Sequence, residues 1–230
     1  MESFKTFRHE FKYVIPYSSM LNFRTKFNEV LNIDRDYNGY MVRSLYFDSI
    51  ENNDYFDKLG GEINRKKIRL RIYDAKSNKV KLAIKSTYDI RQIKDSLVIS
   101  TDDARKLINQ DYEVLLSYDN DVATKIYTIL KKGLYKPKVI IEYDRIAYTT
   151  TTTTRITFDF NIRSSNDIDK FFDDDINYNY LIDKKDVVLE VKFDRFLEPY
   201  ISKILSSYDS RFQSVSKYMM GRNINLWKKF

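Results

Sequence analysis

Apolar and polar residues alternate along much of the chain, and this two-residue period predicts β-strands. β-Branched and aromatic residues are concentrated in the same segments, which strengthens the prediction. The strand signal is clearest over residues 8–15, 42–48, 65–73, 79–85, 138–148, 155–163 and 186–193, and residues 97–99 form a shorter candidate. Because most of these segments are joined by short connections, they favour an antiparallel sheet or barrel.

Helical signals are fewer than strand signals. Ser18 or Ser19 is predicted to cap a first helix, and a second helix is predicted to begin at Thr101. A third helix is predicted over residues 121–132, directly before a glycine that ends it. The tail over residues 198–220 is predicted to form one or two more helices. The predicted fold class is therefore α+β, an antiparallel sheet or barrel with attached helices.

A single domain over residues 1–230 is predicted, because no internal repeat and no linker rich in proline, glycine or serine divides the chain. The six threonines at 149–154 lie between two predicted strands, so we interpret them as strand ends and a turn. The polar stretch 166–186 is interpreted as a surface excursion with at most a short helix.

Composition excludes several classes of protein. The absence of cysteine removes disulfides, thiolate metal sites and cysteine nucleophiles, and a single histidine excludes multi-histidine zinc sites. That residue, His9, lies on the apolar side of its strand and is predicted to pack there. No apolar run approaches the roughly 18 residues of a membrane span, and no signal peptide is present, so we expect a cytoplasmic protein.

The net charge of +7 indicates an anionic partner. In the segment 65–73 the cations share one strand face and the isoleucines and leucine share the other; the cations are Arg65, Lys67, Arg69 and Arg71. Cations two residues apart lie about 7 Å from one another on such a face and repel, which favours a polyanion beside them. At least four other predicted strands also have an apolar face and a charged face.

Two structures would produce this pattern. One is an antiparallel sheet whose polar face lies in water. The other is a barrel whose lumen holds the charged faces and binds triphosphate, with magnesium or manganese bridging phosphate and carboxylate oxygens. The pattern alone leaves both open.

Eight segments in order add a family resemblance: RHEFKY (8–13), VRSLYFD (42–48), RKKIRLRIY (65–73), LAIK (82–85), PKVIIEYDRIAY (137–148), RITFD (155–159), LEVKF (189–193) and SVSKY (214–218). Together they resemble the VTC domain, the polyphosphate polymerase branch of the triphosphate tunnel metalloenzymes. The resemblance implies an eight-stranded antiparallel β-barrel flanked by helices. It also implies transfer of the terminal phosphoryl group of a nucleoside triphosphate, expected to be ATP, to a growing polyphosphate chain, with Mn²⁺ or Mg²⁺ as cofactor.

The resemblance also implies site residues. The catalytic cations would be Arg69, Arg71, Arg155 and Lys85. The further phosphate- or nucleotide-binding residues would be Lys12, Lys94, Arg145, Arg163, Lys192, Ser216 and Lys217. Glu190 would bind the metal, and Glu10, on the same strand face as Lys12, would be a second carboxylate. Ala83 stands where the family often has Glu, which removes a carboxylate that would bind metal or offset the charge of the tunnel.

Two other functions fit the same residues. One is a triphosphatase, although hydrolytic relatives usually carry more acidic residues in the tunnel. The other is a non-catalytic receptor for polyphosphate, inositol phosphates or RNA. Nucleic acid is not expected, because the aromatic residues of these strands lie opposite the cations instead of among them. No Walker loop and no GxGxxG motif occurs. The nucleotide and metal preferences, the primer and the oligomeric state stay open.

Overall fold

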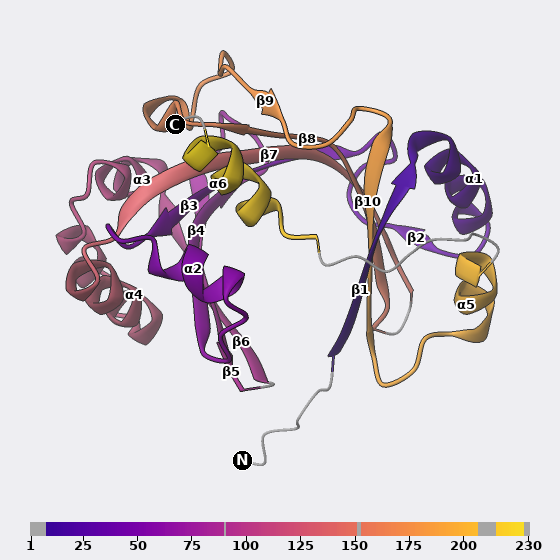
Figure 1. The fold of residues 1–230 in the computed structure, drawn as a ribbon, viewed down its shortest axis with the longest axis horizontal. Helices are drawn as coiled ribbons and strands as arrows, with labels where there is room; N and C mark the ends of the chain where they lie inside the picture. The colour runs from indigo at the N-terminus through magenta and orange to yellow at the C-terminus, as the bar shows by residue number, and fades with distance from the viewer. Residues whose placement is uncertain (1–7, 90, 151–152, 207–214, 228–230) are drawn as a thin grey trace. The chain divides into compact units, whose positions relative to one another are not determined.

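The computed structural model describes residues 8–89, 91–150, 153–206 and 215–227 (Figure 1). In chain order the elements are β1 (Arg8–Pro16), α1 (Tyr17–Asn28), β2 (Asn32–Ile33), β3 (Tyr40–Asp48), α2 (Asn53–Leu59), β4 (Arg65–Ile72), β5 (Lys79–Tyr88), β6 (Arg91–Ser100), α3 (Thr101–Ile108), the 3₁₀ helix η1 (Glu113–Ser117), α4 (Asp121–Lys132), β7 (Lys136–Thr149), β8 (Arg155–Ser165), the 3₁₀ helix η2 (Ile168–Lys170), β9 (Asn179–Tyr180), β10 (Asp186–Asp194), α5 (Pro199–Ser206) and α6 (Lys217–Trp227).

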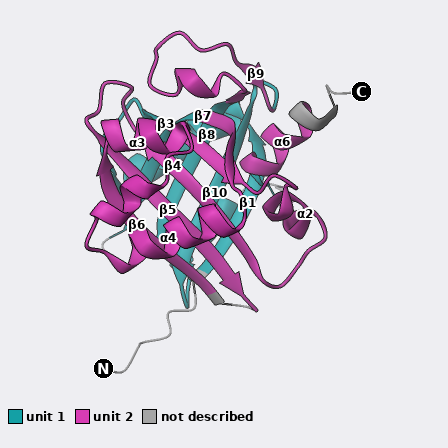
Figure 2. Ribbon diagram, turned by 90° about the vertical axis from the view of Figure 1, so that its left-hand side faces the viewer, with its two compact units in different colours: residues 1–41, 143–162, 182–216 teal, residues 42–142, 163–181, 217–230 magenta. Residues whose placement is uncertain are grey.

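The chain forms two compact units, each assembled from three separate segments (Figure 2). Unit 1 comprises residues 1–41, 143–162 and 182–216, and unit 2 comprises residues 42–142, 163–181 and 217–230. The long strands β7 and β8 contribute residues to both units. The single domain over residues 1–230 stays a prediction.

Eight long strands are hydrogen-bonded in the order β1-β10-β8-β7-β3-β4-β5-β6, and the short strands β2 and β9 pair with β7 and β8. The strand pairs whose registers are described are antiparallel. The predicted α+β class, an antiparallel sheet with flanking helices, is therefore confirmed, whereas the closed eight-stranded barrel that the family resemblance implied is not. In the described residues the strand order is a path from β1 to β6, not a ring.

All seven strong strand predictions correspond to strands in the structure. The short candidate 97–99 is the end of β6, whose polar first half hid its period. The serine cap predicted for the first helix is wrong, because α1 begins directly after Pro16 without a side-chain cap. The helix at Thr101 is confirmed, with Ser100 as its cap, and so is the third helix over 121–132. Helix α2 was missed because seven residues are too few to show a helical period.

In unit 1, the helices α1 and α5 pack on the apolar face of β1, β10 and β8 (Figure 1). Phe27 of α1 is fully buried, and its ring contacts the rings of Tyr148 and Phe158. The predicted packing of His9 on this side is partly seen: its ring stacks on Phe193 at 5.0 Å, but the residue is exposed. The charged residues of these strands are thereby assigned to the opposite face.

In unit 2, the apolar face of β4 and β5 packs against α3, α4 and η1. Ile68, Leu70 and Leu82 on these strands are fully buried, as are Leu107 of α3 and Ile126 of α4. Strand alternation then places Lys67, Arg69 and Arg71 of β4 on the other face. Among the described residues, no helix combines the length and apolar character that crossing a membrane requires; the cytoplasmic location stays a prediction.

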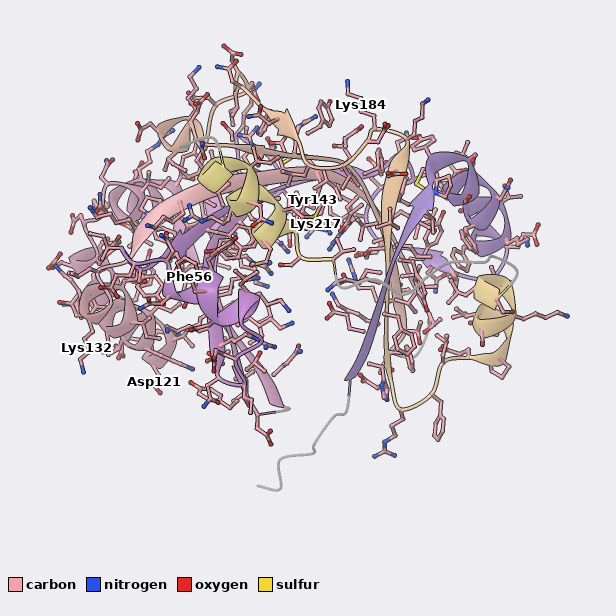
Figure 3. All side chains as sticks on the ribbon, in the orientation of Figure 1. Phe56, Asp121, Lys132, Tyr143, Lys184 and Lys217 are labelled. Atoms are coloured by element: carbon pink, nitrogen blue, oxygen red, sulfur yellow. The ribbon has the colours of Figure 1, made fainter. Side chains whose placement is uncertain are left out.

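Replacing Phe27 with alanine should lower the free energy of unfolding by about 3–5 kcal/mol, because it leaves a cavity among three packed rings. The matched control is Phe56→Ala on α2, where the ring is 52% exposed and the expected change is about 0.5 kcal/mol (Figure 3). Denaturant unfolding of the two variants measures the difference. Equal losses would contradict the burial described for Phe27.

Candidate functional site

Three lysines lie directly opposite one another on neighbouring strands of unit 2. Lys67 of β4 pairs in register with Lys85 of β5, and Lys85 pairs with Lys94 of β6. Like charges that face one another across strands destabilise a sheet. The concentration of positive charge in this row favours an anion beside it.

The adjacent row of the same face contains the first predicted catalytic arginine. Arg69 lies between Tyr46 of β3 and Ala83 of β5, and its guanidinium donates a hydrogen bond to the Tyr46 hydroxyl at 3.3 Å. Arg71, one row further, donates to the Ser44 hydroxyl at 3.0 Å. In the described part of the chain, neither Lys67 nor Arg69 forms an ion pair with a carboxylate.

The crowding of positive charge alters the ionisation of two buried groups. Burial would raise the pKa of Tyr46, but Arg69, Arg71 and Lys67 outweigh it and lower the pKa to about 7. Burial lowers the pKa of Lys67 to about 8, and repulsion from Arg69 and Lys85 adds to the effect. Two buried groups of this face, Tyr46 and Lys67, therefore have pKa values near neutral pH.

Helix α6 carries Lys217 as its first residue and packs against the same face of unit 2 (Figure 3). The Tyr218 ring contacts the Tyr46 ring at 5.2 Å and lies below the Lys67 ammonium at 4.8 Å. Gly221 permits close packing on β7, since a Cβ there would lie 2.3 Å from Ile141. Helix α6 therefore brings Lys217 and Tyr218 into the unit that contains the lysine and arginine rows.

A buried carboxylate fixes the start of α6. Asp48, at the end of β3, accepts hydrogen bonds from the backbone N–H groups of Ser49, Asp54 and Tyr55 and from the hydroxyl of Tyr218. Asp48 is fully buried, so these donors replace the water that a carboxylate otherwise needs. The Asp48–Tyr218 hydrogen bond thus joins α6 to the first turn of α2.

In unit 1 the charged face combines both signs. Lys12, Glu190 and Thr157 lie in one cross-strand row of β1, β10 and β8. Glu10, Lys192 and Arg155 form the next row. The Glu190 carboxylate forms ion pairs with the Lys192 ammonium at 2.8 Å and with the Lys12 ammonium at 3.4 Å. Lys12 also forms an ion pair with Glu10. Burial lowers the pKa of Lys12, but Glu190 and Glu10 outweigh it and the pKa is raised.

The oxygen atoms of Glu190 and Thr157 are suitable ligands for a metal ion that is bound together with a phosphate. The side chain of Glu190 is 8% exposed, and the buried hydroxyl of the facing Thr157 has no hydrogen-bond partner among the described residues. Magnesium usually keeps several waters and takes one or two carboxylates plus substrate phosphates. No group of three acidic or histidine side chains that could hold an ion by itself occurs in the described ranges.

Two arginines of the predicted site, Arg155 and Arg145, are held by carboxylates. Arg155 contacts Asp34 at 2.5 Å. Arg145 forms two hydrogen bonds with the buried Asp159, at 2.6 and 2.8 Å. Burial opposes the charge of Arg145, but Asp159 outweighs it and raises the pKa of the guanidinium. Phosphate binding by these arginines stays a prediction, because a phosphate would have to share or replace these partners.

Arg163 does not continue the strand alternation that Arg155 and Asp159 follow in β8. Asn161 has a φ of 51°, in the left-handed region, and interrupts the alternation of β8. Arg163 instead contacts Glu142, which also contacts the buried Arg43 and accepts a hydrogen bond from Tyr178. Ser216, the remaining predicted residue, is half-buried directly before α6.

The sequence analysis assigned no role to Tyr46, Asp48, Thr157 or Tyr218, and left Lys67 out of the site. Lys67 could have been included, because it shares the strand parity of Arg69 and Arg71. The other four depend on cross-strand register or on the docking of α6, which no local pattern reveals.

Replacing Tyr218 with phenylalanine should lower the free energy of unfolding by about 1.5–3 kcal/mol, because the buried Asp48 carboxylate loses a donor. Amide hydrogen exchange should accelerate first in α6. Tyr127→Phe on α4 is the control, since the Tyr127 hydroxyl has no hydrogen bond in the described structure. Unchanged exchange in α6 would contradict the anchoring role of Asp48.

Comparison with known proteins supports the fold and the family. The model of the VTC domain matches residues 7–225. A candidate adenylate cyclase of Vibrio parahaemolyticus has a TM-score of 0.54 at 11% identity, with 93% of this chain and 97% of that chain covered. A candidate adenylate cyclase of Bacillus halodurans has a TM-score of 0.54 at 12% identity, with 90% and 92% covered.

A Pyrococcus horikoshii protein has a TM-score of 0.50 at 15% identity, with 97% of this chain and all of that chain covered. No curated protein matches the sequence. Identities this low show a shared fold and nothing about activity. The family match is a separate finding and spans almost every strand and helix described above. The chain therefore belongs to the VTC domain family.

Proposed function

We propose that the protein is a polyphosphate polymerase that uses a nucleoside triphosphate, expected to be ATP, as phosphoryl donor. A terminal oxygen of the polyphosphate chain attacks the γ-phosphorus. The bond between this phosphorus and the β–γ bridging oxygen breaks, and the nucleoside diphosphate leaves with that oxygen. One phosphoanhydride bond forms and one breaks, so the reaction needs no further co-reactant.

The observation that carries the proposal is the cationic face of unit 2 in a chain of the VTC domain family. Its Lys67–Lys85–Lys94 row adjoins Arg69, and neither Lys67 nor Arg69 has a carboxylate partner in the described residues. Repulsion within this face is relieved by a ligand with several negative charges on neighbouring phosphates. A triphosphate or a polyphosphate chain has such charges.

Arg69, Arg71 and Lys85 would bind the transferred phosphoryl group and its neighbours. Phosphoryl transfer depends mainly on positioning and on neutralising the charge of the oxygens, and the planar guanidinium of arginine can donate two parallel hydrogen bonds to a phosphate. The attacking phosphate oxygen is already ionised at neutral pH. No side chain is therefore needed to remove a proton.

In unit 1, Glu190 would hold the divalent metal, with Glu10 and the Thr157 hydroxyl as further oxygen donors. When bound, Mn²⁺ or Mg²⁺ supplies Lewis-acid stabilisation of charge on the phosphate oxygens. Lys12 and Lys192 hold the Glu190 carboxylate in place and offset its charge toward an incoming phosphate. Arg155, oriented by Asp34, would add a third cation to this face.

Arg69→Ala should reduce polymer formation about 30- to 1000-fold, the loss expected when one preorganised donor is removed. The measurement incubates purified protein with ATP and Mn²⁺ and resolves polyphosphate on a gel. Lys106→Ala is the control, because Lys106 is exposed on α3 and pairs only with Asp103 in the described contacts. Its activity should equal that of the unaltered protein.

Thermal unfolding of Arg69→Ala separates lost catalysis from lost structure. Long chains that disappear in this variant, with its stability retained, would support the polymerase. Free phosphate without chains would replace the proposal with a triphosphatase. Bound nucleotide or polyphosphate without turnover would replace it with a receptor.

A further inference from the structure

Tyr46 lies in the middle of the cationic face of unit 2. The side chain belongs to β3, is 5% exposed and lies directly opposite Arg69, which donates a hydrogen bond to its hydroxyl oxygen. The Lys67 ammonium lies 5.9 Å from the centre of its ring. A hydroxyl in this position accepts hydrogen bonds from cations more readily than it donates.

The two register neighbours of Arg69 show why this phenol matters. One neighbour is Tyr46 and the other is Ala83, a side chain with no polar atom. Beyond Ala83 the row continues with Ser96, which is also uncharged. Tyr46 is therefore the one acidic group in this cross-strand row of the described strands β3 to β6.

We propose that Tyr46 is the counter-ion of the cation cluster in the free protein, and that a bound triphosphate takes over this role while the Tyr46 oxygen takes up a proton. The inference rests on the proposed function in one respect, that this face binds triphosphate. The inference adds Tyr46 to the binding site, and it couples triphosphate binding to the uptake of one proton.

The step involves one proton and no covalent bond to the ligand. In the free protein the phenolate oxygen accepts the Arg69 hydrogen bond. When the phosphates arrive, Arg69 and Lys67 transfer their interactions to phosphate oxygens. The phenolate then repels the ligand, so it binds a proton from solvent and becomes a phenol that can donate a hydrogen bond to phosphate.

The cations Arg69, Arg71 and Lys67 of β4 lower the pKa of Tyr46. Lys85 of β5 and Lys58 of α2 lower the pKa of the neighbouring Lys67. On α6, burial and the Asp48 carboxylate raise the pKa of Tyr218, so that neighbouring tyrosine stays protonated. The cations lower the pKa of Tyr46 to about 7, against the ordinary value of about 10.

The direction of the pH dependence follows from these charges. A bound polyanion offsets the cations and returns the pKa of Tyr46 toward its ordinary value. Binding then requires proton uptake above about pH 7, and the affinity for triphosphate falls by about tenfold between pH 6 and pH 8 from this group alone. Lys67, with a pKa of about 8, adds a second decline at higher pH.

The test uses inorganic tripolyphosphate and the ultraviolet absorbance of tyrosinate at about pH 8, where ordinary tyrosines are neutral. The free protein should contain about one tyrosinate, which disappears as tripolyphosphate binds. Tyr46→Phe should have no such signal. Its affinity should lack the tenfold decline between pH 6 and pH 8 described above. Tripolyphosphate itself titrates equally with the unaltered protein and with Tyr46→Phe. The difference between their pH dependences of affinity is therefore due to Tyr46.

A second pair of variants tests the counter-ion role without removing the phenol. Ala83→Glu places a carboxylate opposite Arg69 and should abolish the tyrosinate of the free protein at about pH 8. Ala83→Gln has nearly the same size and no charge, and should keep the tyrosinate.

Each outcome separates the two proposals. Tripolyphosphate that binds while the tyrosinate persists, or a free protein without tyrosinate, overturns the role of Tyr46 and leaves the proposed function standing. No binding of tripolyphosphate to the unaltered protein overturns the phosphate-binding function and the inference that rests on it.

Discussion

Repulsion among like charges on one sheet face is the constraint on which the site of unit 2 depends. Lys67, Lys85 and Lys94 face one another across β4, β5 and β6, where a solvated sheet would normally mix charges of both signs. The arrangement is tolerable because the opposite face of the same strands is largely apolar and packs against α3, α4 and η1. Hydrophobic burial on one side thus offsets the electrostatic cost on the other.

Relief of this repulsion by an anion would add to the free energy of binding. A cluster that neutralised itself with carboxylates would have to break those pairs before it bound phosphate. On β4 that is largely avoided, because the register neighbours of Arg69 are a phenol and an alanine. A phenolate is a stronger base than a carboxylate, so it can take up a proton near neutral pH and leave the cations to a polyphosphate.

In unit 1 the cations are paired with carboxylates. Glu190 lies between Lys12 and Lys192, and Arg145 and Arg155 are paired with Asp159 and Asp34. This face is nearly neutral and rich in carboxylate oxygen, which suits a metal–phosphate complex better than a bare anion. Under the proposed function, the cations of unit 2 would bind phosphate and the carboxylates of unit 1 would bind the metal.

The sequence by itself determined the strands, their apolar and charged faces, most helices, and the family. A two-residue period and turn signals depend only on residues that are close together in the chain, so they can be recognised without the fold. It did not determine the register that sets Tyr46 beside Arg69, the turn at Asn161 that moves Arg163 to Glu142, or the docking of Tyr218 on Asp48. These depend on which segments pair and pack, and such contacts join residues far apart in the chain. The tertiary structure alone decided them, because register and burial are properties of pairs of elements and not of any one segment.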